Sequence, residues 1–232
     1  MRKLPDYRSK RKLLQGLDRI AALSDDEIRD EEVLLGIVRG IGLRYDNRGL
    51  YGDEVVHMNW THNGLWQTPK QLVGAMLLLA EHRIESFLEV GTHSGYTFAV
   101  LAAYLHRLNP ELRALTIDPF DYFRHYEAIR AVLPIEYRHC TSEDLRGQAF
   151  DCVLIDGDHT YEAVCRDYEN VGRFARICLF HDINDDHVGQ QHVPRCWREL
   201  VQRGEFSESH ELLDCPPGMR VMGIGVGLRS AA

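Results

Sequence analysis

Two short segments of the sequence carry acidic and imidazole side chains immediately after an apolar run. The first run ends at Asp156, with His159 three residues further on, and the second ends at His181 and Asp182. Two carboxylates and an imidazole that lie together can bind a divalent cation, and a second imidazole can accept a proton from a nearby hydroxyl. We therefore predict a metal site at Asp156, His181 and Asp182, with His159 as the proton acceptor. Taken singly, each residue could instead cap a helix or belong to an ordinary loop.

A glycine-bearing turn, Glu89-Val-Gly-Thr-His-Ser-Gly95, follows another apolar run. Glycine lets the backbone approach a ligand closely, and the helix that the turn opens directs its N-terminus at polar groups. The spacing differs from the dinucleotide-binding fingerprint, because His93 takes the place of its second glycine. A pyrophosphate cofactor, and hence a dehydrogenase, is therefore disfavoured. Glu89 suits a cationic or hydroxyl-rich ligand better than a phosphate.

Further polar residues follow the next two apolar runs. Asp118 ends one of them, where an acid can accept hydrogen bonds from two ribose hydroxyls. The alternative for Asp118 is a turn formed together with Pro119. Ser142 and Glu143 follow the next run, where they could hydrogen-bond an adenine edge or cap a short helix.

The elements that must position these residues are apolar runs alternating with amphipathic segments. Thr68 and Pro69 are typical of the start of a helix and predict a helix to about His82. The expected strands span residues 86–90, 114–118, 135–140, 150–155, 177–180, 211–214 and 221–228, and the intervening helices residues 96–108, 122–133, 161–174 and 193–202. Strands that alternate with helices pair in parallel through right-handed crossovers. We expect an α/β fold: a Rossmann-like, doubly wound, mostly parallel seven-stranded sheet with helices on both faces, which binds ligands beyond the carboxyl ends of its strands.

The first part of the chain reads as an N-terminal helical and loop extension over residues 1–63, preceding the main domain at 64–232. Ser24 and Glu27 have the spacing of a capping box, predicting one helix from there to about Gly40. Residues 40–65 read as an irregular loop, and the basic residues among the first twelve as a solvated tail. The N-terminal helix could pair with a second copy, so a homo-oligomer is an expectation as well.

Composition excludes several classes of protein. The 232 residues are 44% hydrophobic and 27% charged, within the globular range. A net charge of −8 argues against a general nucleic-acid or membrane-surface binder. No apolar run approaches the ~18 residues of a membrane span, and no signal core follows the basic start. The six cysteines include no C-x-x-C pair, and most of them are expected to be core thiols. We expect a cytoplasmic protein.

Taken in order, the strand ends resemble those of the class I S-adenosylmethionine (SAM)-dependent methyltransferases. The turn from Glu89 to Gly95 looks like that family's first motif, and Asp118 looks like its ribose-binding acid. Residues 150–161 and 180–183 are similar to the branch of catechol, caffeoyl-coenzyme A and macrolide-sugar O-methyltransferases. The segment Gly64-Leu-Trp-Gln-Thr-Pro69 is also similar to that branch, so the resemblance begins there and runs to about residue 228.

The resemblance assigns roles by position. It places at SAM the residues Glu89, Gly91, Gly95, Asp118, Ser142, Glu143 and Asp156. Asp156, His181 and Asp182 fall at the metal-ligand positions, and His159 at that of the general base. His181 departs from the carboxylate usual in the branch, which points to a softer ion than magnesium, such as manganese, or to no metal.

The resemblance implies a SAM-dependent methyltransferase that methylates a hydroxyl of a small molecule, assisted by a magnesium or manganese ion. Two alternatives remain open: a metal-independent methyltransferase of the same fold, and a non-catalytic ligand-binding protein. Catechols, sugar hydroxyls and polyketide-type compounds all remain open as acceptors. Specificity for the acceptor is expected in the irregular segments 40–66 and 183–195, where Trp60 and Trp66 could form a wall.

Overall fold

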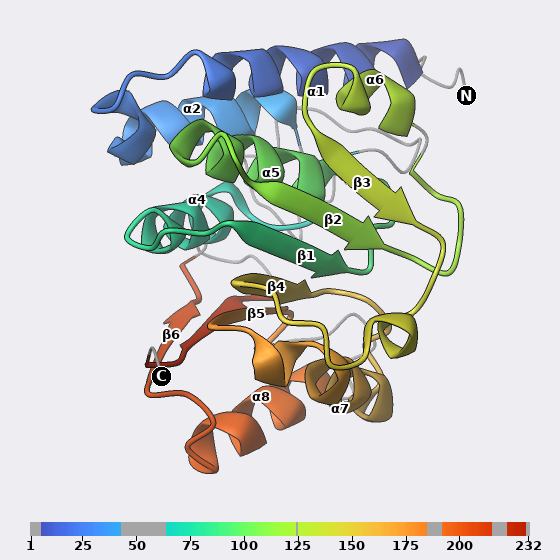
Figure 1. Cartoon of the computed structure of the whole chain (residues 1–232). Helices are drawn as coiled ribbons and strands as arrows, with labels where there is room; N and C mark the ends of the chain where they lie inside the picture. Colours follow the sequence, from blue (N-terminus) through green and yellow to red (C-terminus); the bar gives the residue numbers. More distant parts are fainter. Residues whose placement is uncertain (1–5, 43–63, 124, 185–191, 215–221, 231–232) are drawn as a thin grey trace.

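The computed structural model describes residues 6–42, 64–123, 125–184, 192–214 and 222–230, and a seven-stranded sheet forms its centre (Figure 1). The strands are β1 (Ser86–Val90), β2 (Arg113–Ile117), β3 (Ile135–Arg138), β4 (Cys152–Ile155), β5 (Ile177–His181), β6 (Glu208–Leu212) and β7 (Ile224–Leu228). They are ordered β3-β2-β1-β4-β5-β7-β6, with β1 to β5 parallel and β7 antiparallel to both neighbours. The predicted Rossmann-like, mostly parallel sheet is confirmed.

The order of the strands reverses between β1 and β4, and this reversal determines where a ligand site can form. Every residue of β1, β4 and β5 is buried, because helices cover both faces of a parallel sheet. Val90 of β1 pairs with Ile155 of β4, so the chain leaves both strands at the same level, at Gly91 and Asp156. Such a reversal leaves a crevice beyond the carboxyl ends of the strands.

Helices cover both faces of the sheet. The helices are α1 (Asp6–Ala21), α2 (Glu31–Ile41), α4 (Pro69–Leu79), α5 (Tyr96–Leu108), α6 (Tyr126–Arg130), α7 (Tyr161–Asn170) and α8 (His192–Gln202). Figure 1 shows α1, α2, α4 and α5 on one side of the sheet and α7 and α8 on the other. Thr68 caps α4 as expected, since its hydroxyl accepts from the Gln71 backbone N–H. The helix expected over 122–133 is shorter, and the one expected over 161–174 ends as a separate 3-10 turn, Gly172–Phe174.

The N-terminal region folds differently from the single helix expected between Ser24 and Gly40. Ser24 and Glu27 do form the reciprocal hydrogen bonds of a capping box, but these open only a 3-10 turn, Glu27–Arg29. Asp30 then adopts an extended conformation and caps α2 by accepting from the Val33 N–H at 3.0 Å. The second cap interrupts the helix because an extended residue cannot continue it. The buried residues of α1 and α2 share one apolar core with α4 and α5.

Two further expectations can be compared with the described residues. Cys152, Cys178 and Cys196 are buried free thiols, as predicted, while Cys215 lies outside the described part of the chain. Among the helices that the structure describes, none is long and apolar enough to cross a membrane.

Candidate active site

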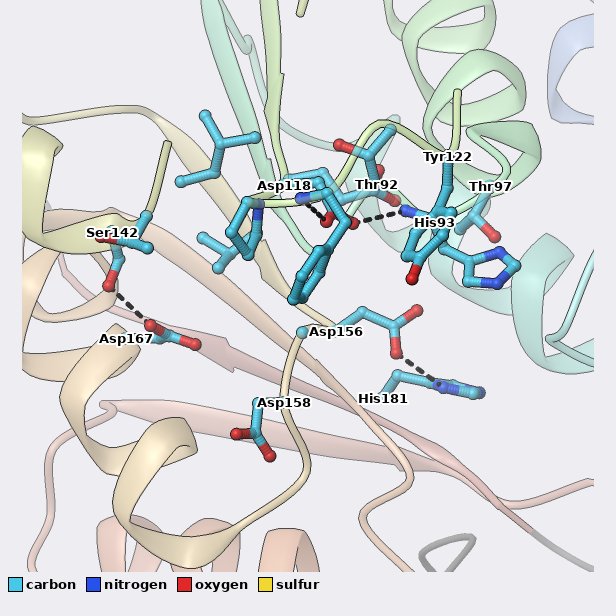
Figure 2. A pocket seen from close by; sticks show the side chains of 18 of the residues that line it. Thr92, His93, Thr97, Asp118, Tyr122, Ser142, Asp156, Asp158, Asp167 and His181 are labelled. Carbon is cyan, nitrogen blue, oxygen red and sulfur yellow. Dashed lines mark hydrogen bonds and ion pairs between the residues drawn. The ribbon is translucent and has the colours of Figure 1, made fainter. Parts of the chain in front are cut away.

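A cavity of about 450 Å³ lies at the carboxyl ends of β1, β2 and β4. This volume is within the range of small-molecule sites. The cavity is lined by seven of the residues predicted from the sequence: Glu89, Gly91, Asp118, Ser142, Asp156, His159 and His181. Three other predicted residues, Gly95, Glu143 and Asp182, do not line it. Figure 2 shows side chains from several strand ends pointing into this space.

The two glycines of the turn after β1 are required by the backbone. Gly91 has φ +98°, and a Cβ there would lie 2.2 Å from the Asp156 carbonyl oxygen. Gly95 has φ +76° and precedes α5, and a Cβ there would lie 2.2 Å from the Phe123 ring. A side chain at either position would therefore clash as well as strain the backbone. Gly91 borders the cavity, whereas Gly95 shapes the turn.

The carboxylate of Asp118 ties this turn to the loop after β2. Its Oδ2 accepts from the His93 backbone N–H at 2.9 Å, and its Oδ1 accepts from the Phe120 N–H at 2.8 Å (Figure 2). His93 has φ +44°, so the carboxylate holds a backbone conformation that is uncommon outside glycine. Asp118 is 7% exposed and lines the cavity. Each oxygen keeps a lone pair for a ligand hydroxyl.

Glu89 is the most deeply buried acid that lines the cavity. The Thr116 hydroxyl donates to its Oε2 at 2.9 Å. Burial first, and then the charge of Asp156, raises the pKa of Glu89 well above its ordinary value. The neutral form is therefore favoured, and a nearby cationic ligand would instead favour the carboxylate.

The third group of polar residues includes one that sequence reasoning missed. The Ser142 hydroxyl donates to Asp167 Oδ1 at 2.6 Å (Figure 2) and accepts from the Asn170 amide at 2.9 Å. Asp167 lies inside α7 and lines the cavity, yet nothing in its local sequence separates it from a surface acid. Glu143 does not line the cavity, and its Oε1 lies 3.8 Å from Nε of Arg166, which does. Ser142 and Asp167 are thus the polar pair at this end of the cavity.

The two carboxylates and two imidazoles predicted as a metal site do come together, but they pair with one another. His159 Nδ1 lies 3.1 Å from Asp182 Oδ2, and His159 Nε2 lies 3.6 Å from Asp156 Oδ1. His181 Nδ1 lies 3.1 Å from Asp156 Oδ1 and 3.6 Å from Asp182 Oδ2. Asp182 is fully buried at φ +61°, a strained conformation for a residue that is not glycine.

The electrostatics of this four-residue network are those of two ion pairs. Burial alone would lower the pKa of His159, but hydrogen bonding to Asp156 and Asp182 and their charges raise it to about 10. Burial likewise lowers the pKa of His181, but the two carboxylates together have the larger effect, so this pKa is also raised. Burial would raise the pKa of Asp156, but the two imidazoles hold it far below its usual range. The two carboxylates therefore favour the protonated forms of both imidazoles.

This arrangement does not fit a bound cation. A metal ion would need the carboxylate oxygens and one imidazole nitrogen to face a common point with their lone pairs free. Here one oxygen of each carboxylate, Asp156 Oδ1 and Asp182 Oδ2, already faces two imidazole nitrogens. Within the described residues, no group of three or more His, Cys, Asp or Glu side chains is placed to hold a metal ion. The predicted metal site at Asp156, His181 and Asp182 is therefore not supported, because charge pairing among the side chains takes its place.

Sequence reasoning also missed three aromatic or imidazole residues that line the cavity, His93, Phe120 and Tyr122. Trp66 packs edge-on against His93, which lies against Tyr122, and Tyr122 against Phe120. All four line the cavity and form an aromatic wall. Trp66, which the sequence suggests as a wall residue, is one of these four. Trp60 and the acidic and histidine residues at 185–187 lie outside the described part of the chain.

We expect the protein to be less stable at alkaline pH, because the ion pairs of His159 are lost there. Because its pKa rises from 6.5 in the unfolded chain to about 10 in the folded one, its contribution is complete below pH 6.5 and is lost as pH rises towards 10. Between pH 7 and pH 10, the free energy of unfolding should fall by about 3 kcal/mol more in the wild type than in His159→Gln, equivalent to about 6–12 °C in Tm. Calorimetry of both proteins after chelator treatment tests this. Parallel Tm curves would contradict the ion pairing.

Comparison with known proteins was consistent with this geometry. Residues 88–183 match the family described as "Methyltransferase domain". No curated protein matches the chain. Among solved structures, the O-methyltransferase TomG of Streptomyces achromogenes, involved in tomaymycin synthesis and bound to SAM, is 21% identical, with a TM-score of 0.51 over 72% of this chain and 82% of that one.

Two further structures are similar over different lengths. The O-methyltransferase of Bacillus cereus in complex with SAH is 16% identical, with a TM-score of 0.54 over 93% of this chain and 96% of that one. The SAM-dependent O-methyltransferase of Thermotoga maritima is 10% identical, with a TM-score of 0.52 over 74% of this chain and 69% of that one. At these identities the likeness establishes the fold.

Proposed function

We propose that this chain is a class I SAM-dependent methyltransferase that transfers a methyl group to a hydroxyl oxygen of a small molecule. The match of residues 88–183 to a methyltransferase domain and the shared fold support this proposal. The observation that carries the proposal is the cavity. The glycine turn at Gly91, the carboxylate of Asp118 and the polar pair of Ser142 and Asp167 follow one another along the cavity. SAM has the same order of parts: an amino acid, a ribose and an adenine. Two structures of similar fold, from Streptomyces achromogenes and Bacillus cereus, are O-methyltransferases in complex with SAM or SAH, which adds support.

Each part of the cavity suits one part of SAM. Asp118 would accept hydrogen bonds from the ribose hydroxyls, and Ser142 with Asp167 would contact the adenine edge. Gly91 lets the backbone approach the amino-acid portion closely, and Glu89 provides an acid for a cationic group. When bound, SAM supplies an electrophilic methyl group on a sulfonium.

The chain's own contribution to the reaction is orientation and proton transfer. We assign His159 as the group that takes the proton of the acceptor hydroxyl, because it lines the cavity between the two carboxylates. The oxygen then attacks the methyl carbon and the carbon–sulfur bond breaks. Only the unprotonated fraction of His159 can accept a proton, so the rate should rise with pH towards the pKa of about 10. The aromatic wall would hold the acceptor against this face.

We expect turnover to survive removal of divalent cations. Asp156 and Asp182 face the imidazole nitrogens of His159 and His181 at 3.1 Å, so the two carboxylates already have partners without a bound cation. Turnover should change less than about twofold after dialysis against a chelator, and added magnesium or manganese should not raise it, whereas a metal-assisted enzyme loses several kcal/mol of charge stabilisation. A loss on chelation that manganese restores would contradict this proposal and favour a cation at Asp156, His181 and Asp182.

The test of the proposed function is methyl transfer itself. The protein is incubated at pH 9 with SAM labelled in its methyl group and with a panel of catechols, sugars and polyketide-type alcohols. Labelled product whose methyl group is attached to oxygen supports the proposal. SAM binding without product from any class of acceptor would favour the ligand-binding alternative.

A further inference from the structure

The side-chain amide of Gln67 connects the first turn of α5 to the carboxylate of Asp156. Gln67 lies just before α4 and is 1% exposed. Its Nε2 donates to Asp156 Oδ2 at 2.9 Å, and its Oε1 accepts from the Thr97 hydroxyl at 2.5 Å. A carboxylate can only accept and an amide oxygen can only accept, so these two partners fix which way the amide points.

This link determines which oxygen of Asp156 faces the imidazoles. Oδ2 is held by Gln67, which leaves Oδ1 to contact His181 Nδ1 at 3.1 Å and His159 Nε2 at 3.6 Å. The terminal torsion of an aspartate is broad, so a carboxylate without such a donor can rotate. Figure 2 shows Asp156 between the Thr97 side of the site and His181.

We propose that Gln67 is a positioning residue for the reaction: it fixes the orientation of Asp156 and thereby that of His159. The inference rests on the proposed function, because it assumes that His159 takes the acceptor proton. It also explains a buried amide where an apolar side chain would fill the space. Removing the donor would leave Asp156 Oδ2 unpaired in a buried setting, while the cavity residues that contact SAM stay in place.

The chain provides a matched control in Gln71. It lies on α4, is also 1% exposed, and neither polar atom of its side chain has a hydrogen-bond partner among the described residues. It does not line the cavity. Gln71→Met and Gln67→Met therefore make the same chemical change at equal burial, and only the second breaks a link to Asp156.

The first measurement compares kinetics and SAM affinity of the two variants. We expect kcat of Gln67→Met to fall about 10- to 100-fold, as is usual for residues that orient a reacting group. The Kd for SAM should stay within about twofold, and Gln71→Met should keep both values within about twofold. Thr97→Val, which removes only the hydroxyl that orients the amide, should lower kcat by a smaller factor. It serves as the second variant if Gln67→Met does not fold.

The second measurement needs no activity. In a double-mutant cycle followed by urea unfolding, Gln67→Met and Asp156→Ala should be coupled by at least about fivefold in the unfolding equilibrium constant, and Gln71→Met and Asp156→Ala should not. Equal kcat in both methionine variants, or absence of coupling, would overturn the inference. So would a loss of SAM affinity as large as the loss of kcat. No turnover by the wild type would instead show that the proposed function itself has failed.

Discussion

Asp118→Ala should weaken SAM binding at least about 100-fold, equivalent to about 2.7 kcal/mol. The carboxylate would make charge-assisted hydrogen bonds to the ribose hydroxyls, and it also holds the His93 and Phe120 backbone amides that shape the turn. Removing it loses both the ligand contacts and the form of the turn. Equilibrium dialysis with labelled SAM measures the change.

Two further variants separate the contact from a general effect on the loop. Asp121→Ala lies on the same loop with its side chain 75% exposed and outside the cavity lining, so it should keep wild-type affinity. Asp118→Asn keeps one acceptor oxygen and loses the charge, so an intermediate loss of about tenfold is expected. Wild-type affinity in Asp118→Ala would contradict the assignment of the ribose site.

His159→Gln should lower kcat about 100-fold at pH 9, with a smaller difference at pH 7. General bases contribute on the order of 10²–10⁴ to rate, but in the wild type a pKa of about 10 leaves His159 largely protonated at neutral pH. The wild-type rate should therefore rise by up to about tenfold per pH unit between pH 7 and pH 9, while the glutamine variant stays nearly flat. Steady-state kinetics across this range, on chelator-treated protein, measure both.

The matched control for this variant is His139→Gln. The His139 side chain is 52% exposed and outside the cavity lining, so the substitution should leave the whole profile unchanged. A His159→Gln profile that rises in parallel with the wild type would show that another group takes the proton.

The fold and the strand ends could be predicted because buried parallel strands are continuous apolar runs that stop at polar residues. Asp118, Asp156 and His181 follow such runs directly, and the sheet brings them to one edge. Gln67 and Asp167 could not be found in this way. They reach the cavity from a segment before α4 and from within α7, and their role depends on packing rather than on local sequence.

The pairing of the two carboxylates with the two imidazoles also could not be predicted from the sequence. Two carboxylates and an imidazole are suitable ligands for a cation, so the residue types alone indicated a metal site. The choice between a cation and an ion-pair network depends on the left-handed backbone at Asp182, which brings its carboxylate to His159. Likewise, the apolar pattern predicted one continuous helix, but the cap at Asp30 starts a new helix, α2. Local signals compete, and tertiary packing decides between them.

The most direct test of the central claim is a calorimetric titration of SAM into the chelator-treated wild-type protein. The geometry of the cavity predicts binding of one SAM per chain, with a Kd between about 1 µM and 1 mM, the range usual for enzyme substrates. Absence of binding at millimolar SAM, with or without magnesium or manganese, would contradict the methyltransferase function and leave the cavity to another ligand.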